Sequence, residues 1–277
     1  MSVPVVLLIV LFVLMVAVGG KRGAKSFFTV LLNFITFAAL LKFMAIGFDP
    51  VKVTVVGCII ISSVTLFYIN GFNKKTKAAL VSVTIVVFLT ILLAIGMGTS
   101  AKMQGFGWEQ AESVAYLSMY VRLDFARVVI CEIVLGLIGA IIDVAISISS
   151  ALNEIYRMNP SIGRKVLFQS GMNIGKDMLG TMTNTLLFAY IGGFLALIFW
   201  FHVLKYSIGD VINAKVFCSE VFGILTSGIG IILIIPVSAF ITPIFLLFQS
   251  PLKKKPAVVD LAVSQFPHSD GKKTEEN

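Results

Sequence analysis

The sequence predicts an all-α integral membrane protein with seven transmembrane helices, and three observations support this. Of its 277 residues, 58% are hydrophobic and only 13% are charged, whereas an ordinary soluble domain carries about 25% charged residues. Apolar runs of about 20 residues, long enough for a helix to cross the ~30 Å hydrocarbon layer, recur along nearly the whole chain. Lysines and arginines cluster in the short connections between these runs, as they do at the cytoplasmic ends of membrane helices.

Each apolar run is expected to be a helix, because a helix satisfies its own backbone hydrogen bonds and a closed barrel needs alternating segments of about ten residues. The last run is too long for one simple span and contains Pro236 and Pro243, so we expect it to be tilted or kinked. The predicted spans are residues 2–19, 26–46, 51–69, 78–98, 127–151, 179–203 and 217–249.

The basic clusters fix the expected orientation. "KRGAK", "NKKTK", the loop 152–178 and the "KKK" after the last run all fall on one side if every run crosses, which places the N-terminus outside and the C-terminus inside. The net charge of +8 then comes from basic residues at the cytoplasmic helix ends and does not indicate nucleic-acid binding. The first run lacks a positive stretch before it, which is typical of an uncleaved helix; cleavage as a signal peptide would leave six helices in the same orientation.

The domain organisation is simple. Residues 1–250 form one transmembrane domain, and residues 251–277 form a largely disordered cytoplasmic tail. The external segment 99–126 mixes aromatic and charged residues, which is typical of a helix lying in the membrane interface. The polar segment 152–178 is expected to be a cytoplasmic loop.

Several kinds of chemistry are excluded by the residues present. There are two histidines and three cysteines, without CxxC spacing or an HExxH sequence, so no metal site is expected. Walker A, GxGxxG and GxSxG sequences are absent as well. The sequence therefore predicts no cofactor, no enzymatic activity and no transport driven by the protein's own ATP hydrolysis.

The main candidate residue is Asp143, in the middle of "GAIIDVAISISSALNEI". A charged side chain at mid-bilayer costs at least ~2.5–3.5 kcal/mol and usually faces a bundle interior or a water-filled cavity, so a protonatable carboxyl group is the simplest interpretation. Small or polar residues share its helix face and favour close packing against another helix, with this face pointing inward. The alternative is a packing interface in which Asp143 only hydrogen-bonds to a neighbour. The residues of this helix-packing face are Gly136, Gly139, Ala140, Ser147 and Ser150.

The following helix supplies polar neighbours. "GKDMLGTMTNTLLFAYIGGFLAL" carries Thr181 and Asn184, with Gly192 farther along the same face. Because the two helices run antiparallel, Asp143 at ~12 Å and Asn184 at ~8 Å from the cytoplasmic helix ends are expected to meet at similar depth. Asp143, Thr181 and Asn184 are thus the candidates for a proton relay.

Four further charged residues are weaker candidates. Glu154 lies at the cytoplasmic end of the Asp143 helix, and Asp177 is expected to start the next helix, where an anion favours the helix dipole. Arg127 and Glu132 begin the Asp143 helix and are expected to form an interfacial ion pair or an external gate.

Together, "GAIIDVAISISSALNEI" and "GKDMLGTMTNTLLFAYIGG" resemble the two signature stretches of the YibE/F-like family of bacterial multi-pass membrane proteins. The resemblance covers roughly residues 125–250, and the short soluble content is similar to that of YibF-type members. It implies a protein of the bacterial plasma membrane, with a larger YibE-type partner or a second copy as the expected protein partner, and it implies no substrate.

A more distant resemblance concerns mechanism. GxxxDxxI, formed by Gly139, Asp143 and Ile146, is similar to the fourth-helix motif of the RND superfamily, which includes MMPL lipid exporters and SecD/SecF proteins. It implies that the second to seventh spans form an RND-like six-helix unit. Glu154 matches the acidic position after that motif, but Ala151 stands where an arginine is expected. The large external domain of RND proteins is replaced by about four residues, 47–50.

Two functions are therefore expected from different classes. The first is a secondary, proton-coupled membrane transporter or transporter subunit, in which Asp143 takes up and releases a proton. The alternative is a non-transporting assembly or accessory protein that docks a larger YibE-type partner. A membrane-embedded enzyme ranks third, because no catalytic pairing is visible. The substrate, the coupling ion and the direction of transport do not follow from the sequence.

Overall fold

The computed structural model describes residues 3–100 and 125–247, and every regular element in these ranges is helical. Among them, five helices are long and apolar enough to cross a membrane, or six if α6 (Arg164–Gly193) and α7 (Leu195–Val203), which meet at a bend of 42°, count as one span. The chain is therefore an all-helical multi-pass membrane protein. Seven separate spans and their orientation stay predictions.

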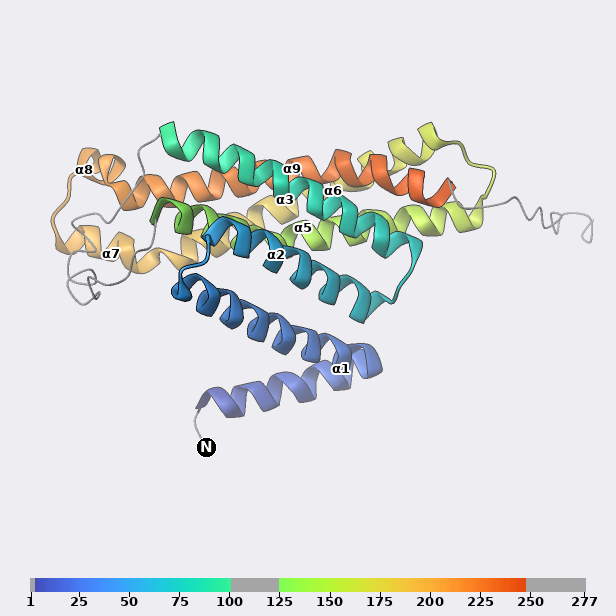
Figure 1. Ribbon diagram of the computed structural model, residues 1–277, viewed down its shortest axis with the longest axis horizontal. Helices are drawn as coiled ribbons and strands as arrows, with labels where there is room; N and C mark the ends of the chain where they lie inside the picture. Colours follow the sequence, from blue (N-terminus) through green and yellow to red (C-terminus); the bar gives the residue numbers. More distant parts are fainter. Residues whose placement is uncertain (1–2, 101–124, 248–277) are drawn as a thin grey trace, which may run out of the picture.

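The difference in span number lies in α1 (Val3–Ile46), which joins the first two expected runs. Gly20 interrupts this element with φ 54° and ψ −134°, a left-handed conformation that favours glycine, and the chain reverses there into a helical hairpin (Figure 1). The two arms touch at Gly23, where a Cβ atom would lie 1.7 Å from the carbonyl oxygen of Met15. Only glycine fits at this crossing.

The second arm of α1 packs on α2 (Pro50–Ser63) and on η1 (Val64–Tyr68), a π-helical turn that continues α2. The amide of Asn33 donates a hydrogen bond of 3.0 Å to the hydroxyl of Thr65 in η1. A side-chain hydrogen bond of this kind joins helices inside a membrane. The hairpin is thus attached to the bundle through its second arm.

The bundle core lies where α3 (Lys74–Ser100), α5 (Phe125–Met158), α6 and α9 (Lys215–Leu247) pack together (Figure 1). α9 continues through both of its prolines as one helix of 33 residues. It is joined to α5 by a buried hydrogen bond of 2.8 Å between the hydroxyls of Ser149 and Thr242. The core is mostly apolar, with buried hydroxyl side chains such as Ser82, Thr90 and Ser238 among its aliphatic residues. Its fully buried apolar side chains include Val86, Leu137, Ile148, Ile234 and Leu246.

Close packing of α6 on α9 depends on two glycines one helical turn apart. A Cβ atom at Gly171 would lie 2.9 Å from the Cβ of Ala239, and one at Gly175 would lie 2.2 Å from Cγ2 of Ile235. Small residues at this spacing let two membrane helices approach closely. This contact sets the position of α6 beside α5.

A short connection joins α7 to α9. It contains α8 (Ile208–Asn213), which begins with a capping box formed by Ser207 and Asp210. Hydrogen bonds donated by the hydroxyl and the backbone N–H of Ser207 hold the pKa of the Asp210 carboxyl below its usual value. These bonds favour the charged form of the cap.

The structure corrects one expectation about the segments between and after the helices, and two others fall outside the described residues. The expected cytoplasmic loop 152–178 is mostly helical, because α5 continues to Met158 and α6 already begins at Arg164. Only residues 159–163 connect the two helices. Most of the expected external segment, residues 101–124, and the expected tail 251–277 lie outside the described residues.

Candidate functional site

The candidate site is the side of α5 that the described residues of the chain leave largely uncovered. Ile141, Val144 and Ile148 point into the core and are fully buried. Asp143 lies on the opposite side of the helix and is exposed. One series of residues at three- and four-residue intervals through Asp143 shares its face and contains only acidic or small side chains, with Ile146 at the edge of this face. We call this face the α5 stripe: Glu132, Gly136, Gly139, Asp143, Ser147, Ser150 and Glu154.

The expectation that the small polar face points into the bundle is wrong for the single chain. Asp143, Gly139 and Ser147 are exposed, Ala140 and Ser150 are half-buried, and the bulky aliphatic side of α5 is inside. Large aliphatic side chains fill the space between helices at the density that a protein core requires. On α5 the aliphatic side therefore packs in the core of the single chain, and the face that carries Asp143 lies outside.

α6 does not bring its polar residues to Asp143. Thr181 donates its hydroxyl hydrogen to the carbonyl of Met178 within its own helix, at 2.9 Å. Asn184 is exposed on the side of α6 that faces away from the core. Within the described residues, no hydrogen bond or ion pair reaches Asp143 or Asn184. The proposed relay of these three residues is therefore not assembled inside one chain.

The longer α6 also changes the expected depths. Counted from the connection at 159–163, Asp143 lies about 22 Å along α5, Thr181 about 26 Å and Asn184 about 30 Å along α6, at ~1.5 Å per residue. Thr181 is thus closer in depth to Asp143 than Asn184 is. Asp177, expected at a helix start, lies in the middle of α6 and is exposed, so its role as a helix cap is wrong.

The glycines along this side differ in what surrounds them. A Cβ atom at Gly136 would lie 2.9 Å from the hydroxyl oxygen of Tyr190, so α6 crosses the α5 stripe near its Glu132 end. At Gly139, Gly180 and Gly192 no atom lies within 4 Å of a Cβ position. These three glycines leave room for a further helix.

The α5 stripe carries three carboxyl groups, spaced evenly along the axis of the helix. Glu132, Asp143 and Glu154 follow one another at intervals of 11 residues, which is about three helical turns and about 16 Å. All three are exposed on the same face. Their spacing places one acid toward each end of the helix and one near its middle.

The two outer members have charged or polar neighbours. Glu154 forms an ion pair with Arg157, with 3.3 Å between its Oε1 and Nη1 of Arg157. This arginine lies three residues after the glutamate, whereas the RND motif has its arginine three residues before, where Ala151 stands. Glu132 lies close enough to Glu220 of α9 for their charges to interact.

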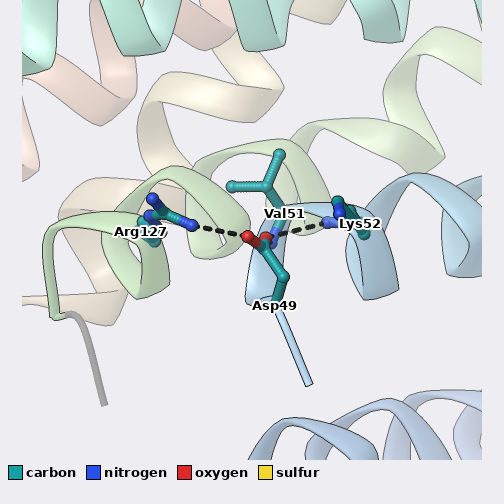
Figure 2. Close-up of polar contacts among 4 residues, drawn as sticks. All are labelled: Asp49, Val51, Lys52 and Arg127. Atoms are coloured by element: carbon teal, nitrogen blue, oxygen red, sulfur yellow. Dashed lines mark hydrogen bonds and ion pairs between the residues drawn. The ribbon is translucent and has the colours of Figure 1, made fainter. Parts of the chain in front are cut away.

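Arg127 pairs with Asp49 of α2, and not with Glu132 (Figure 2). Asp49 also caps α2, because its Oδ1 accepts hydrogen bonds from the backbone N–H groups of Val51 at 3.0 Å and Lys52 at 3.3 Å. One carboxyl group therefore fixes the start of α2 and ties it to the start of α5. The sequence pattern Asp49-Pro50, a cap residue before a proline at the first helical position, is the signal that identifies it.

The family model for YibE/F-like proteins matches residues 7–247, which include both arms of α1 and the whole α5 stripe. The chain belongs to the YibE/F-like family. No curated protein and no solved structure matches it.

A polar cluster in this YibE/F-like protein was not identified from the sequence. The hydroxyl of Tyr190 on α6 lies 3.0 Å from the hydroxyl of Ser227 on α9, and the charges of Glu132 and Glu220 both act on the phenol. The signal in the sequence is the spacing of Glu220, Gly223 and Ser227, which share one face of α9. This cluster joins three helices at the Glu132 end of the α5 stripe.

The described residues of this YibE/F-like protein include no group of three or more histidine, cysteine, aspartate or glutamate side chains that could hold a metal ion. The two buried cysteines, Cys58 and Cys131, lie on α2 and α5. Both are packed in the apolar interior and act as small apolar residues.

Asp49→Ala is expected to lower the free energy of unfolding by about 1–2 kcal/mol, because it removes a helix cap worth about 1 kcal/mol and a half-exposed ion pair worth at most about 1 kcal/mol. Asp49→Asn keeps a capping oxygen and should lose only the ion pair. Unfolding of both variants in detergent, followed by circular dichroism, measures the difference. Equal losses for the two variants would show that the cap contributes nothing.

Proposed function

We propose that this protein is a subunit of a proton-coupled secondary transporter in the bacterial plasma membrane, with Asp143 as the group that takes up and releases the proton. The observation that supports the proposal is an exposed carboxyl group near the middle of a membrane helix. Leaving it against lipid costs at least ~2.5–3.5 kcal/mol, so such a group is found beside a protein neighbour or a water-filled cavity. Within its described residues the chain supplies no hydrogen-bond or ion-pair partner for this group.

Three carboxyl groups along one uncovered face support proton coupling. Glu132, Asp143 and Glu154 lie toward the outer end, the middle and the inner end of α5 in the expected orientation. A proton crossing the membrane needs protonatable groups or water at successive depths, and the α5 stripe offers a carboxyl group at three of them. Because these groups are about 16 Å apart, water molecules or groups of the partner would have to link them. A second membrane chain covering the stripe would enclose that route.

The distant RND resemblance supports the same function. Gly139, Asp143 and Ile146 match its GxxxDxxI motif, and the helices after the first arm of α1 would form the six-helix unit. Residues 47–49, between α1 and α2, stand where RND proteins carry a large external domain. The proposed partner is therefore a larger YibE-type protein, which would supply that domain, with this chain as the YibF-type subunit.

Asp143→Asn is expected to abolish proton-coupled transport while the protein stays folded, because asparagine has nearly the same shape and does not titrate. The measurement uses proteoliposomes of the complex purified from native membranes, with a pH-sensitive dye inside. Asp143→Glu, which keeps a carboxyl group, is the matched control and should retain part of the proton movement. Unchanged proton movement in Asp143→Asn would contradict the proposal.

The alternative is an accessory protein that uses the α5 stripe only to dock a partner. The small residues at three- and four-residue intervals around Asp143 favour it, because they are typical of tight helix pairing. In that case Asp143→Asn should weaken co-purification with the partner, and no proton or solute flux should depend on this residue. The same pair of variants therefore separates the two functions.

A further inference from the structure

A polar cavity lies at the end of the bundle where α3 begins and α5 ends. Its volume is about 320 Å³, and it is formed by the residue before α3, the first turn of α3 and the last two turns of α5. Each lining residue is polar or charged: Asn73, Lys74, Lys75, Asn153, Glu154 and Arg157. Neither the transport proposal nor the family assignment gives this cavity a function.

The charges around the cavity are unbalanced. Two ammonium groups and one guanidinium group face a single carboxylate, that of Glu154. This carboxylate is already paired with Arg157, and both side chains are more than half exposed, at 59% and 70%. An exposed ion pair of this kind contributes little and opens readily. The cavity thus has an excess of positive charge and donors that can turn toward a ligand.

The start of α3 adds to this excess. The N-terminal end of a helix carries a partial positive charge, which acidic residues usually compensate, but the first turn of α3 contains none and begins with Lys74 and Lys75 instead. The loop before it is held in place, because the hydroxyl of Thr76 accepts a hydrogen bond of 2.9 Å from the N–H of Asn73. The amide of Asn73 donates to the carbonyl of Asn70 and so does not cap the helix.

We propose that this cavity binds a phosphate group, held by Lys74, Lys75 and Arg157 with the amides of Asn73 and Asn153 as further donors. A guanidinium group binds phosphate oxygens in pairs, and lysines add point charges. The amides supply N–H donors to the remaining oxygens. The phosphate can belong to the headgroup of an anionic lipid or to a soluble phosphate compound.

The position of the cavity relates it to the membrane surface. In the expected orientation this end of the bundle is cytoplasmic, where basic pockets between membrane helices bind anionic headgroups. Above Lys74, α3 presents exposed apolar side chains at Val81, Ile85 and Phe88, which a lipid chain can follow. A lipid source is therefore the first to test.

The experiment uses the full-length chain in nanodiscs of phosphatidylcholine that contain an increasing fraction of phosphatidylglycerol, with native mass spectrometry to count retained lipids. The double variant Lys75→Gln/Arg157→Gln should bind phosphatidylglycerol about 30-fold more weakly, at roughly fivefold per cation lost. Lys21→Gln/Lys25→Gln, which removes two cations from α1 on the same side, is the matched control for general surface attraction and should retain more phosphatidylglycerol than the cavity variant does.

A second variant, expected to strengthen lipid binding, controls for misfolding. Glu154→Gln removes the only carboxylate of the cavity and frees Arg157, so it should strengthen binding. Inorganic phosphate added to the same samples separates the sources: if it displaces phosphatidylglycerol, a soluble phosphate compound also fits the site. Equal binding by the double variant and the α1 control, with no competition by inorganic phosphate, would overturn the proposal.

Discussion

Replacing Gly175 with valine is expected to push α6 away from α9 and to lower the free energy of unfolding by about 1–3 kcal/mol, the usual effect of overpacking a core. A Cβ atom at this position would lie 2.2 Å from Cγ2 and 3.1 Å from Cβ of Ile235. These atoms are close to the backbone of α9 and cannot swing aside as the end of a long side chain can. The helix itself therefore has to move.

The matched control is Gly180→Val, on the same helix. It changes helix propensity by the same amount, but no atom lies within 4 Å of a Cβ at Gly180, so only the propensity effect should appear. Unfolding of both variants in mixed detergent micelles, followed by circular dichroism, gives the two free energies. If Gly180→Val is as destabilised as Gly175→Val, the close contact between α6 and α9 is contradicted.

Hydropathy predicted most of the long apolar helices but not where they end. The expected runs 127–151 and 179–203 lie inside longer helical segments, since α5 continues to Met158 and α6 begins at Arg164. The polar ends of these helices still bury Leu152, Leu167 and Gly171 against their neighbours. A hydropathy window measures transfer into lipid and does not detect such contacts between helices.

The hairpin in α1 escaped prediction for a different reason. The basic segment "KRGAK" correctly marks the break between two apolar runs. The reversal itself depends on the left-handed conformation of Gly20 and on the contact of Gly23 with the backbone at Met15. The sequence alone does not show whether a glycine is needed for a left-handed backbone conformation or for close contact between two helices.

The candidate site could be predicted in part. Periodicity groups Gly139, Asp143 and Ser147 on one helix face, and the structure places them there. Periodicity alone does not say whether that face points inward, since both faces of α5 are compatible with packing. The bulk of Ile141 and Ile148 decides the question in a single chain, because larger apolar side chains fill a core better.

Gly139→Val is expected to leave the isolated chain as stable as Gly228→Val and to weaken its assembly with the partner chain proposed to cover the α5 stripe. Among the described residues, no atom outside the immediate helix backbone lies within 4 Å of a Cβ at either glycine, so neither variant meets a clash there. A partner helix packed on Gly139 would be held off by the added side chain. Overpacking worth about 1–3 kcal/mol weakens association by roughly 5- to 150-fold.

The measurement is affinity purification of each variant from native membranes, with the amount of co-purified membrane protein compared after equal yields of the tagged chain. Gly228→Val on α9 is the matched control, since it makes the same substitution in a membrane helix outside the α5 stripe. Loss of the partner with Gly139→Val alone supports a stripe covered by another chain. Equal recovery with both variants means that nothing packs on Gly139, and Asp143 then requires a water-filled cavity and not a protein neighbour.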